Sequence, residues 1–162
     1  MGNTLDKMSQ MGTIGDLVGG GQNHDLEKFL TKQELADYLV VDKRTIYRLR
    51  LVENKGFPIY KLGGQYRGRD SAVEKWLNGH RYPNQTEDDY ILKIRYDENE
   101  HPKPLKKMDE SAKILKTSKR TVLRLIQNKG LPAFMVGGQV RIDLYLLNEW
   151  IENQEHQQQN FK

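Results

Sequence analysis

Residues 42–49 have the sequence Asp-Lys-Arg-Thr-Ile-Tyr-Arg-Leu, and residues 118–125 have the sequence Ser-Lys-Arg-Thr-Val-Leu-Arg-Leu. The two octets share the Lys-Arg-Thr triplet and the Arg-Leu pair, and they begin 76 residues apart (118 − 42). In both octets an oxygen-bearing side chain, Asp42 or Ser118, precedes the first basic residue, and side chains of this kind cap the N-terminus of a helix. Each octet therefore predicts a short helix that begins at a lysine.

Further matches follow the octets in the same order, so a longer segment is duplicated. Beyond the octets the offset falls to 74, because the first copy has two extra residues near 51–53. The later matches are Asn54-Lys-Gly-x-Pro58 with Asn128-Lys-Gly-x-Pro132, Gly63-Gly-Gln-x-Arg67 with Gly137-Gly-Gln-x-Arg141, and Trp76 with Trp150. An ordered series of this kind indicates an internal repeat, and we expect two copies of one small domain.

The polar and apolar pattern of the first copy predicts a helix-turn-helix. Thr31 and Glu34 have the spacing of a capping box, which predicts one short helix just before the octet. Within the octet, Ile46 and Leu49 are three residues apart and form the expected buried face, while the arginines lie on the opposite face. Two short helices joined by a tight turn form a helix-turn-helix.

A hairpin and a third helix are predicted to follow in each copy. The pairs Gly63-Gly64 and Gly137-Gly138 stand between apolar or β-branched residues, as in a two-residue hairpin turn, and they lack the Gly-Lys-Ser/Thr sequence of a phosphate-binding loop. Asp70 or Ser71 can cap a third helix that buries Trp76. The predicted fold class is mainly α with small β-hairpins (α+β), built as two tandem winged helix-turn-helix domains.

The domain boundaries follow from the repeat. We expect a flexible N-terminal arm over residues 1–28, the first domain over 29–79 and the second over 105–152. Residues 80–104 form a spacer, in which the alternation of apolar residues over 90–96 predicts one strand. Residues 153–162 are rich in Gln and Asn and predict a polar tail.

The composition excludes several classes of function. The 162 residues carry a net charge of +4 and contain no cysteine, so disulfides and thiolate chemistry are excluded. The four histidines lie far apart, and no nucleophile–base pair or metal-ligand spacing is present, so we expect no enzyme, metal, cofactor or small-molecule ligand. No apolar run is long enough to span a membrane, and the chain is expected to be cytoplasmic. Basic residues outnumber acidic ones in both repeats, which favours two sites for a polyanion.

Both copies resemble the excisionase-type helix-turn-helix domain of the MerR-like superfamily. The resemblance rests on Leu30-Thr-x-x-Glu34-x-Ala36-x-x-Leu39, Lys43-Arg-Thr-Ile-Tyr-Arg-Leu49, Gly56-Phe-Pro58, Gly63-Gly-Gln-Tyr-Arg67 and Trp76-Leu77. It implies binding of double-stranded DNA, with the second helix in the major groove and the hairpin, or wing, near the minor groove or the backbone.

The resemblance and the repeat together give a set of candidate DNA contacts. Arginine suits such contacts because its planar fork can meet guanine O6 and N7, and its charge neutralises phosphate. Lysines at the start of the second helices oppose the helix dipole, so helix stability does not account for them. The candidates are Lys43, Arg44, Thr45, Tyr47, Arg48, Gln65 and Arg67 in the first copy, and Lys119, Arg120, Thr121, Arg124, Gln127, Gln139 and Arg141 in the second.

Two functional hypotheses follow. The first is a DNA-binding protein that contacts two directly repeated or flexibly spaced half-sites through both modules. The resemblance implies an excisionase that recruits a recombinase or integrase, or a transcription regulator of a mobile element; phage packaging and plasmid maintenance are further roles of related domains. The second hypothesis is a protein-interaction adaptor in which the first module alone binds DNA. It rests on departures of the second copy, where Lys107 replaces the capping Thr and the wing carries Met135, Val140 and Asp143.

Overall fold

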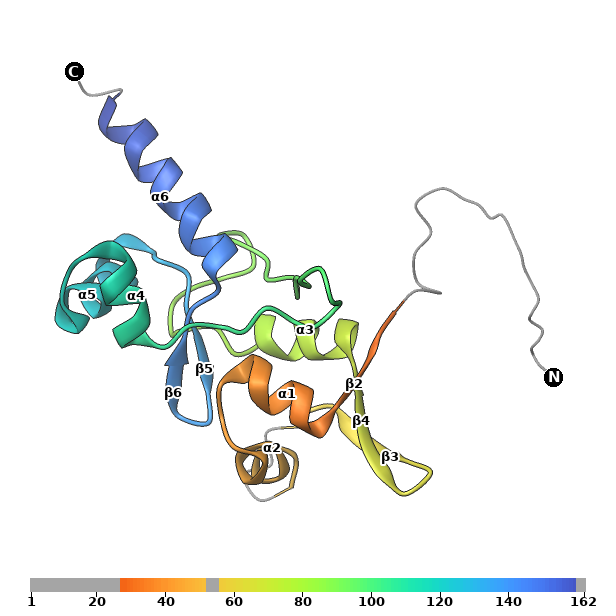
Figure 1. The fold of residues 1–162 in the computed structure, drawn as a ribbon. Helices are drawn as coiled ribbons and strands as arrows, with labels where there is room; N and C mark the ends of the chain where they lie inside the picture. Colours follow the sequence, from red (N-terminus) through yellow and green to blue (C-terminus); the bar gives the residue numbers. More distant parts are fainter. Residues whose placement is uncertain (1–26, 52–55, 160–162) are drawn as a thin grey trace.

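The computed structural model of the chain describes residues 27–51 and 56–159 (Figure 1). The first repeat forms β2 (Phe29–Thr31), α1 (Lys32–Leu39), α2 (Lys43–Arg50), β3 (Ile59–Leu62), β4 (Gln65–Arg69) and α3 (Asp70–Asn78). The second repeat forms α4 (Met108–Leu115), α5 (Lys119–Lys129), β5 (Phe134–Val136), β6 (Gln139–Arg141) and α6 (Leu144–Gln159). The predicted α+β class with two winged helix-turn-helix units is confirmed. Nearly all of the predicted arm over 1–28 lies outside the described residues.

The helix starts in the first domain follow the predicted caps. The Thr31 hydroxyl accepts a hydrogen bond from the backbone of Glu34 at 3.0 Å, and the Glu34 carboxylate accepts one from the backbone of Thr31 at 2.9 Å. Asp42 accepts from the backbone of Thr45 at 2.9 Å and so caps α2. These bonds satisfy N–H groups that have no partner within the helix, which sets the first residue of each helix.

The third helix begins without the predicted cap. Asp70 is the first residue of α3, and its carboxylate accepts a hydrogen bond from the Tyr96 hydroxyl at 2.9 Å. The Asp70 side chain therefore ties the spacer to this helix, because Tyr96 belongs to the spacer.

The wings differ in the number of strands. In the first domain β2, β4 and β3 form an antiparallel sheet with β4 in the middle, and β2 was not predicted. In the second domain the sheet consists of β5 and β6 only. Lys106 and Ile142 form an isolated bridge at the position equivalent to β2, and Arg81 forms another with Phe134 of β5. Both Gly-Gly turns have positive φ at each glycine, as the predicted two-residue hairpin turns require.

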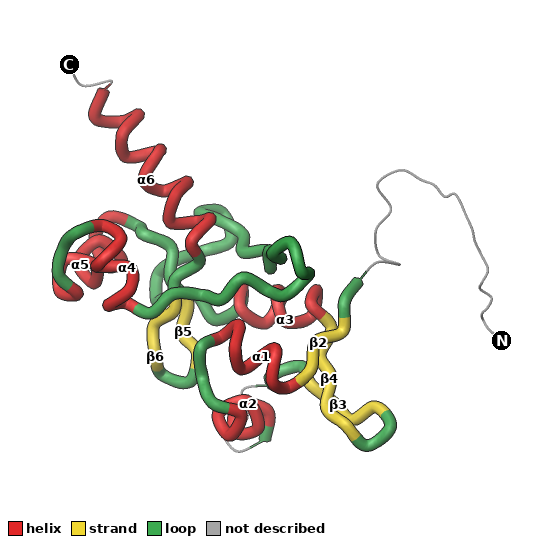
Figure 2. The backbone as a smooth tube through the Cα atoms, viewed as in Figure 1, coloured by secondary structure: helices red, strands yellow, loops and turns green. Residues whose placement is uncertain are grey.

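The spacer contains no strand over residues 90–96, contrary to the prediction. The alternation of burial is as expected, with Leu92 and Ile94 buried beneath exposed neighbours. The backbone of this segment, however, pairs with side chains of α3. Leu92 N–H donates to Asn78 Oδ1 at 2.9 Å, and Ile94 N–H donates to Glu74 Oε2 at 2.8 Å. Figure 2 shows the resulting loop beside α3.

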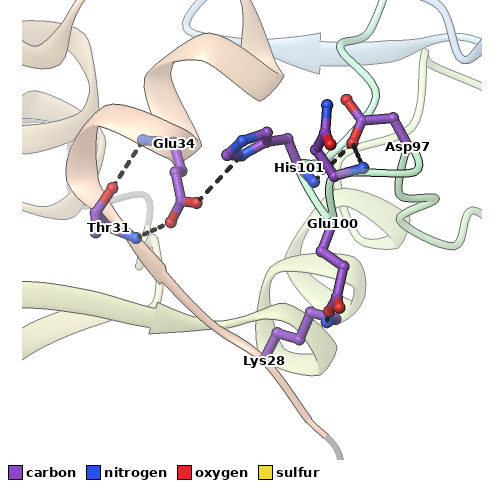
Figure 3. A network of polar contacts seen from close by, with 7 residues as sticks. Lys28, Thr31, Glu34, Asp97, Glu100 and His101 are labelled. Atoms are coloured by element: carbon purple, nitrogen blue, oxygen red, sulfur yellow. Dashed lines mark hydrogen bonds and ion pairs between the residues drawn. The ribbon is translucent and has the colours of Figure 1, made fainter.

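A polar network fastens the end of the spacer to the start of α1 (Figure 3). His101 Nδ1 lies 3.9 Å from the carboxylate of Glu34, and Lys28 forms an ion pair with Glu100. The Asp97 carboxylate accepts from the backbone of His101 at 3.0 Å, which holds the intervening turn. The spacer therefore folds back along the first domain instead of extending between the two domains.

The two domains share a hydrophobic core. One buried cluster contains the first-domain residues Leu35, Ile46 and Leu77 together with Phe134 and Val136 of the second wing. A smaller cluster around Val122 fills the second domain. Because the wing of the second domain is part of the first core, we describe the tandem as one packed body rather than two tethered ones.

The C-terminal helix is longer than predicted. Helix α6 extends to Gln159 and so includes most of the region expected to be a polar tail. It projects from the body toward the C-terminus (Figure 1). Among the described residues, no helix has the length and apolar character needed to cross a membrane.

Candidate nucleic-acid interface

Helix α2 presents a basic surface opposite its buried face. Ile46 and Leu49 are buried, whereas Lys43, Arg44 and Arg48 lie at exposed positions. The Arg44 side chain is 91% exposed and lies 3.7 Å from the Asp42 carboxylate. Hydrogen bonding to the backbone of Thr45 lowers the pKa of Asp42, so this capping carboxylate stays charged at neutral pH.

A groove of about 540 Å³ lies between the start of α1, the start of α2 and the wing of the first domain, and the predicted contacts Lys43, Gln65 and Arg67 line it. Tyr47 and Tyr66 meet edge to face beside it, with ring centroids 6.2 Å apart. Lys32 Nζ lies 5.4 Å from each of these rings, and Lys61 Nζ lies 5.7 Å from the ring of Tyr66. Cations placed over aromatic rings beside a basic helix form a surface suited to a phosphate backbone.

Lys32, Lys61 and Tyr66 were not among the sequence-predicted contacts. Lys61 and Tyr66 come from the β3–β4 hairpin, whereas Lys32 comes from α1, which is distant along the chain and adjacent to the hairpin in the folded domain. The resemblance places the wing near DNA and so favours basic and aromatic residues there, such as Lys61 and Tyr66. It gives no such signal for Lys32, which belongs to α1.

Helix α5 repeats the basic surface of α2. Ser118 caps it by accepting from the backbone of Thr121 at 3.1 Å, and Val122 and Ile126 are buried. Lys119, Arg120 and Arg124 lie at exposed positions. The two helices therefore present the same three cations in the same order.

The groove beside α5 differs from the groove beside α2. The residues equivalent to Lys32, Tyr47, Lys61 and Tyr66 are Met108, Leu123, Met135 and Val140. All four are half-buried, and Met108 and Val140 pack against the core of the second domain. The cations and rings of the first groove are thus replaced by aliphatic side chains, which cannot neutralise phosphate.

The two wing arginines occupy different environments despite identical local contacts. Arg67 donates to Tyr66 O and to Gln65 Oε1, each at 2.7 Å, and is half-exposed. Arg141 makes the same local bonds, to Val140 O at 2.9 Å and Gln139 Oε1 at 2.7 Å.

Arg141 also reaches into the first domain. Its Nε donates to Leu39 O at 2.8 Å, its Nη2 donates to Val40 O at 2.7 Å, and the residue is only 3% exposed. Burial lowers the pKa of Arg141, yet a guanidinium keeps its proton at neutral pH. The predicted DNA contact at Arg141 is therefore replaced by a contact between the domains, because its side chain is buried against the end of α1.

Three other candidates have partners within the protein. The Thr45 side chain lies against the second wing, since a Cβ built on Gly137 would come within 3.2 Å of Thr45 Cγ2. The Thr121 hydroxyl accepts from Ser118 at 3.1 Å, and Gln127 Nε2 donates to the Tyr82 hydroxyl at 3.1 Å. These contacts hold the start of each second helix and the face of α5 nearest the spacer.

The two basic helices lie on either side of the second wing. In the view of Figure 1, α5, the β5–β6 wing, α2 and the β3–β4 wing succeed each other from left to right. Within residues 27–51 and 56–159, no three His, Asp or Glu side chains gather as a metal site.

A family model described as a helix-turn-helix domain matches the chain twice, at residues 29–81 and 107–155. These two matches cover well over half of the chain, which therefore belongs to this family of DNA-binding helix-turn-helix proteins. Comparisons with curated proteins and with solved structures returned no match.

Proposed function

We propose that the chain binds duplex DNA through both helix-turn-helix modules at once and recognises two directly repeated half-sites at one fixed spacing. The observation that carries this proposal is the pair of equivalent cationic surfaces on α2 and α5. The fixed spacing is supported by the core that the two domains share and by the bonds of Arg141 to the end of α1. The proposed base and phosphate contacts are Lys43, Arg44, Tyr47, Arg48, Gln65, Arg67, Lys119, Arg120 and Arg124, with Lys32, Lys61 and Tyr66 added in the first groove.

Selection of the full chain on a random duplex DNA pool tests this proposal. We expect two directly repeated half-sites separated by a single distance, because the domains do not move independently. Arg44→Ala and Arg120→Ala should each weaken specific binding about 5- to 150-fold, the equivalent of about 1–3 kcal/mol for a lost base contact. Lys75→Ala on α3, away from both second helices, removes the same charge and should leave specific binding unchanged. Unchanged affinity in the Arg44 variant would show that α2 is not a recognition helix.

For the biological role, we propose an excisionase or a transcription regulator of a mobile element. Support comes from the tandem of small winged domains and the resemblance of both copies to excisionase-type modules. An excisionase should raise recombination between the ends of the element in the presence of its integrase, whereas a regulator should change transcription from a promoter that contains the selected site. Measuring both activities with wild type and Arg44→Ala separates the two roles.

A second candidate function is an adaptor in which the first domain alone holds DNA. The replacement of Lys32, Tyr47, Lys61 and Tyr66 by aliphatic residues in the second domain favours it. Under this function the selection returns a single half-site, and Arg120→Ala binds as tightly as wild type.

A further inference from the structure

The second domain contacts the first through one face of its wing, through Leu105 ahead of α4, and through the edge of β5, where Phe134 forms a bridge with Arg81. Leu105, Phe134, Val136 and Arg141 are between 0% and 3% exposed. Leu105 N–H donates to Tyr38 O at 2.9 Å, and Phe134 and Val136 join the core of the first domain. Together with the Arg141 bonds to the end of α1, these contacts dock an apolar sheet face on the C-terminal end of a helix.

The first domain has the same face, but there it is exposed. The repeat equivalents of Leu105, Phe134 and Val136 are Phe29, Tyr60 and Leu62, and these side chains are 48%, 38% and 47% exposed. We call Phe29, Tyr60, Leu62 and Arg67 the docking face.

The sheet register of the two faces is the same. Tyr60 lies opposite Arg67 in the first wing, as Phe134 lies opposite Arg141 in the second. Arg67 has the two local bonds that also position Arg141, and among the described residues it has no further hydrogen-bond partner. The docking face is therefore already arranged like the face that the second domain buries.

The surface that receives the second domain also has an exposed equivalent. The surface that receives the second domain is the end of α1, where Tyr38 is 1% exposed and Val40 adopts the left-handed conformation with a φ of 58°. In the second domain the equivalent residues at the end of α4 are Ile114, which is 45% exposed, and Lys116, with a φ of 55°. We call Ile114, Leu115 and Lys116 the receiving face.

We propose that copies of this chain associate head to tail, with the docking face of one copy seated on the receiving face of the next. The partner is a second copy because one chain carries both a docking face and a receiving face. The contact between the two domains within the chain shows how two such faces pack against each other. The two faces lie toward opposite ends of the molecule, on β3–β4 and on α4 (Figure 1). A contact between two different faces leaves one unused face on each copy of a dimer, so further copies can add to form an open chain or a closed ring.

The contact between copies should be weaker than the one within a chain. Within the chain, Phe134 forms an antiparallel bridge with Arg81, and Met135 N–H donates to His80 O at 2.7 Å. The repeat equivalents of His80 and Arg81 are Gln154 and Glu155, which lie inside helix α6 and cannot form this bridge in the receiving copy. Lys116 also stands where the first domain has Val40, so it adds a positive charge beside the incoming Arg67. The association is therefore expected to depend strongly on concentration. It does not rest on the proposed DNA function.

Sedimentation velocity of the full chain without DNA, from about 10 µM to about 1 mM, tests the proposal in the range of weak protein contacts. Wild type should rise above the 18.9 kDa monomer and, at high concentration, beyond the dimer mass. Leu62→Glu in the docking face and Ile114→Glu in the receiving face should each keep the chain monomeric. Ile91→Glu in the spacer, at a side chain that is 50% exposed, is the matched control and should associate like wild type.

Mixing the two defective variants provides the decisive measurement. Each retains one intact face, so an equimolar mixture of Leu62→Glu and Ile114→Glu should form dimers and nothing longer. Dimers in the mixture also show that both variants fold. A wild type that stays monomeric throughout, a mixture that stays monomeric, or equal loss of association in the Ile91 control would overturn the proposal.

Discussion

The groove of the first domain leads to a quantitative prediction about the salt dependence of DNA binding. Lys32 and Lys61 bring two positive charges to the rings of Tyr47 and Tyr66 beside α2. Methionine occupies both equivalent positions in the second domain, so Lys32→Met with Lys61→Met removes the two cations of the first groove and leaves the rings of Tyr47 and Tyr66 in place. Methionine has a similar length and fits both helix and strand, so the variant should fold like wild type.

The magnitude follows from counterion release. Each neutralised phosphate contributes about −0.9 to the slope of log affinity against log salt concentration. If the full chain contacts roughly seven phosphates, its slope is about −6.3, and loss of two contacts should reduce it by about 1.8, to about −4.5. Between 50 and 200 mM salt, the ratio of wild-type to variant affinity should then shrink by about 4 to the power 1.8, or about 12-fold.

Fluorescence anisotropy with the selected duplex at four or more salt concentrations measures the slope. The control is Lys75→Met with Lys93→Met, which removes the same charge from α3 and the spacer and should leave the slope unchanged. A slope equal to wild type in the Lys32–Lys61 variant would refute the assignment of this groove to DNA. Equal losses in both variants would mean that net charge, and no specific groove, sets the slope.

Two further predictions concern stability. Arg141→Met should lower the unfolding free energy by about 3 kcal/mol, because it leaves two buried carbonyls of the first domain without their charged donor. Arg67→Met, the matched control, should change the unfolding free energy by less than about 0.5 kcal/mol. Urea unfolding of both variants measures the difference. Burial raises the pKa of Glu74 above its usual value of 4.5, so its contribution favours folding below that pH and is lost as pH rises through the folded pKa. In Glu74→Gln the amide oxygen can still accept the hydrogen bond from Ile94 N–H. The melting temperature of this variant should exceed that of wild type at pH 7 and equal it near pH 3.5. A higher melting temperature of wild type at pH 7 would contradict the role of burial.

The local parts of the fold could be predicted from the sequence because their determinants are close along the chain. Asp42 and Ser118 cap α2 and α5 through backbone groups three residues away, and Ile46 and Leu49 are buried as their spacing requires. The conformation of each Gly-Gly turn likewise depends on two adjacent glycines, which both have positive φ. Such features need no information about the rest of the chain.

The spacer was mispredicted because its hydrogen-bond partners are distant side chains. The alternation over residues 90–96 correctly predicts that Leu92 and Ile94 are buried, but a buried alternating segment needs partners for its backbone that no periodicity specifies. Asn78 and Glu74 supply them from α3. A β-strand and a segment whose backbone pairs with side chains have the same alternating pattern, so the sequence alone does not distinguish them.

Arg141 shows the same limit at the candidate site. The sequence Gly-Gly-Gln-x-Arg is identical in both copies, and the local bonds of its arginine are identical as well. The difference arises about 100 residues away, where the end of α1 offers two carbonyls to Arg141 and nothing in the described chain offers them to Arg67. Equivalence by repeat therefore predicts local structure well and exposure poorly.

This difference between the two copies makes the tandem asymmetric from one end to the other. Domain packing buries one wing face and leaves its equivalent exposed, and side-chain replacements give α2 and α5 different grooves. The two ends of the molecule are therefore not interchangeable. A protein built this way should bind a direct repeat in one orientation only, with the first domain supplying more of the salt-dependent affinity. Inverting one half-site at constant spacing should therefore lower affinity to that of a single half-site, and equal binding to direct and inverted arrangements would show that the domains separate on DNA.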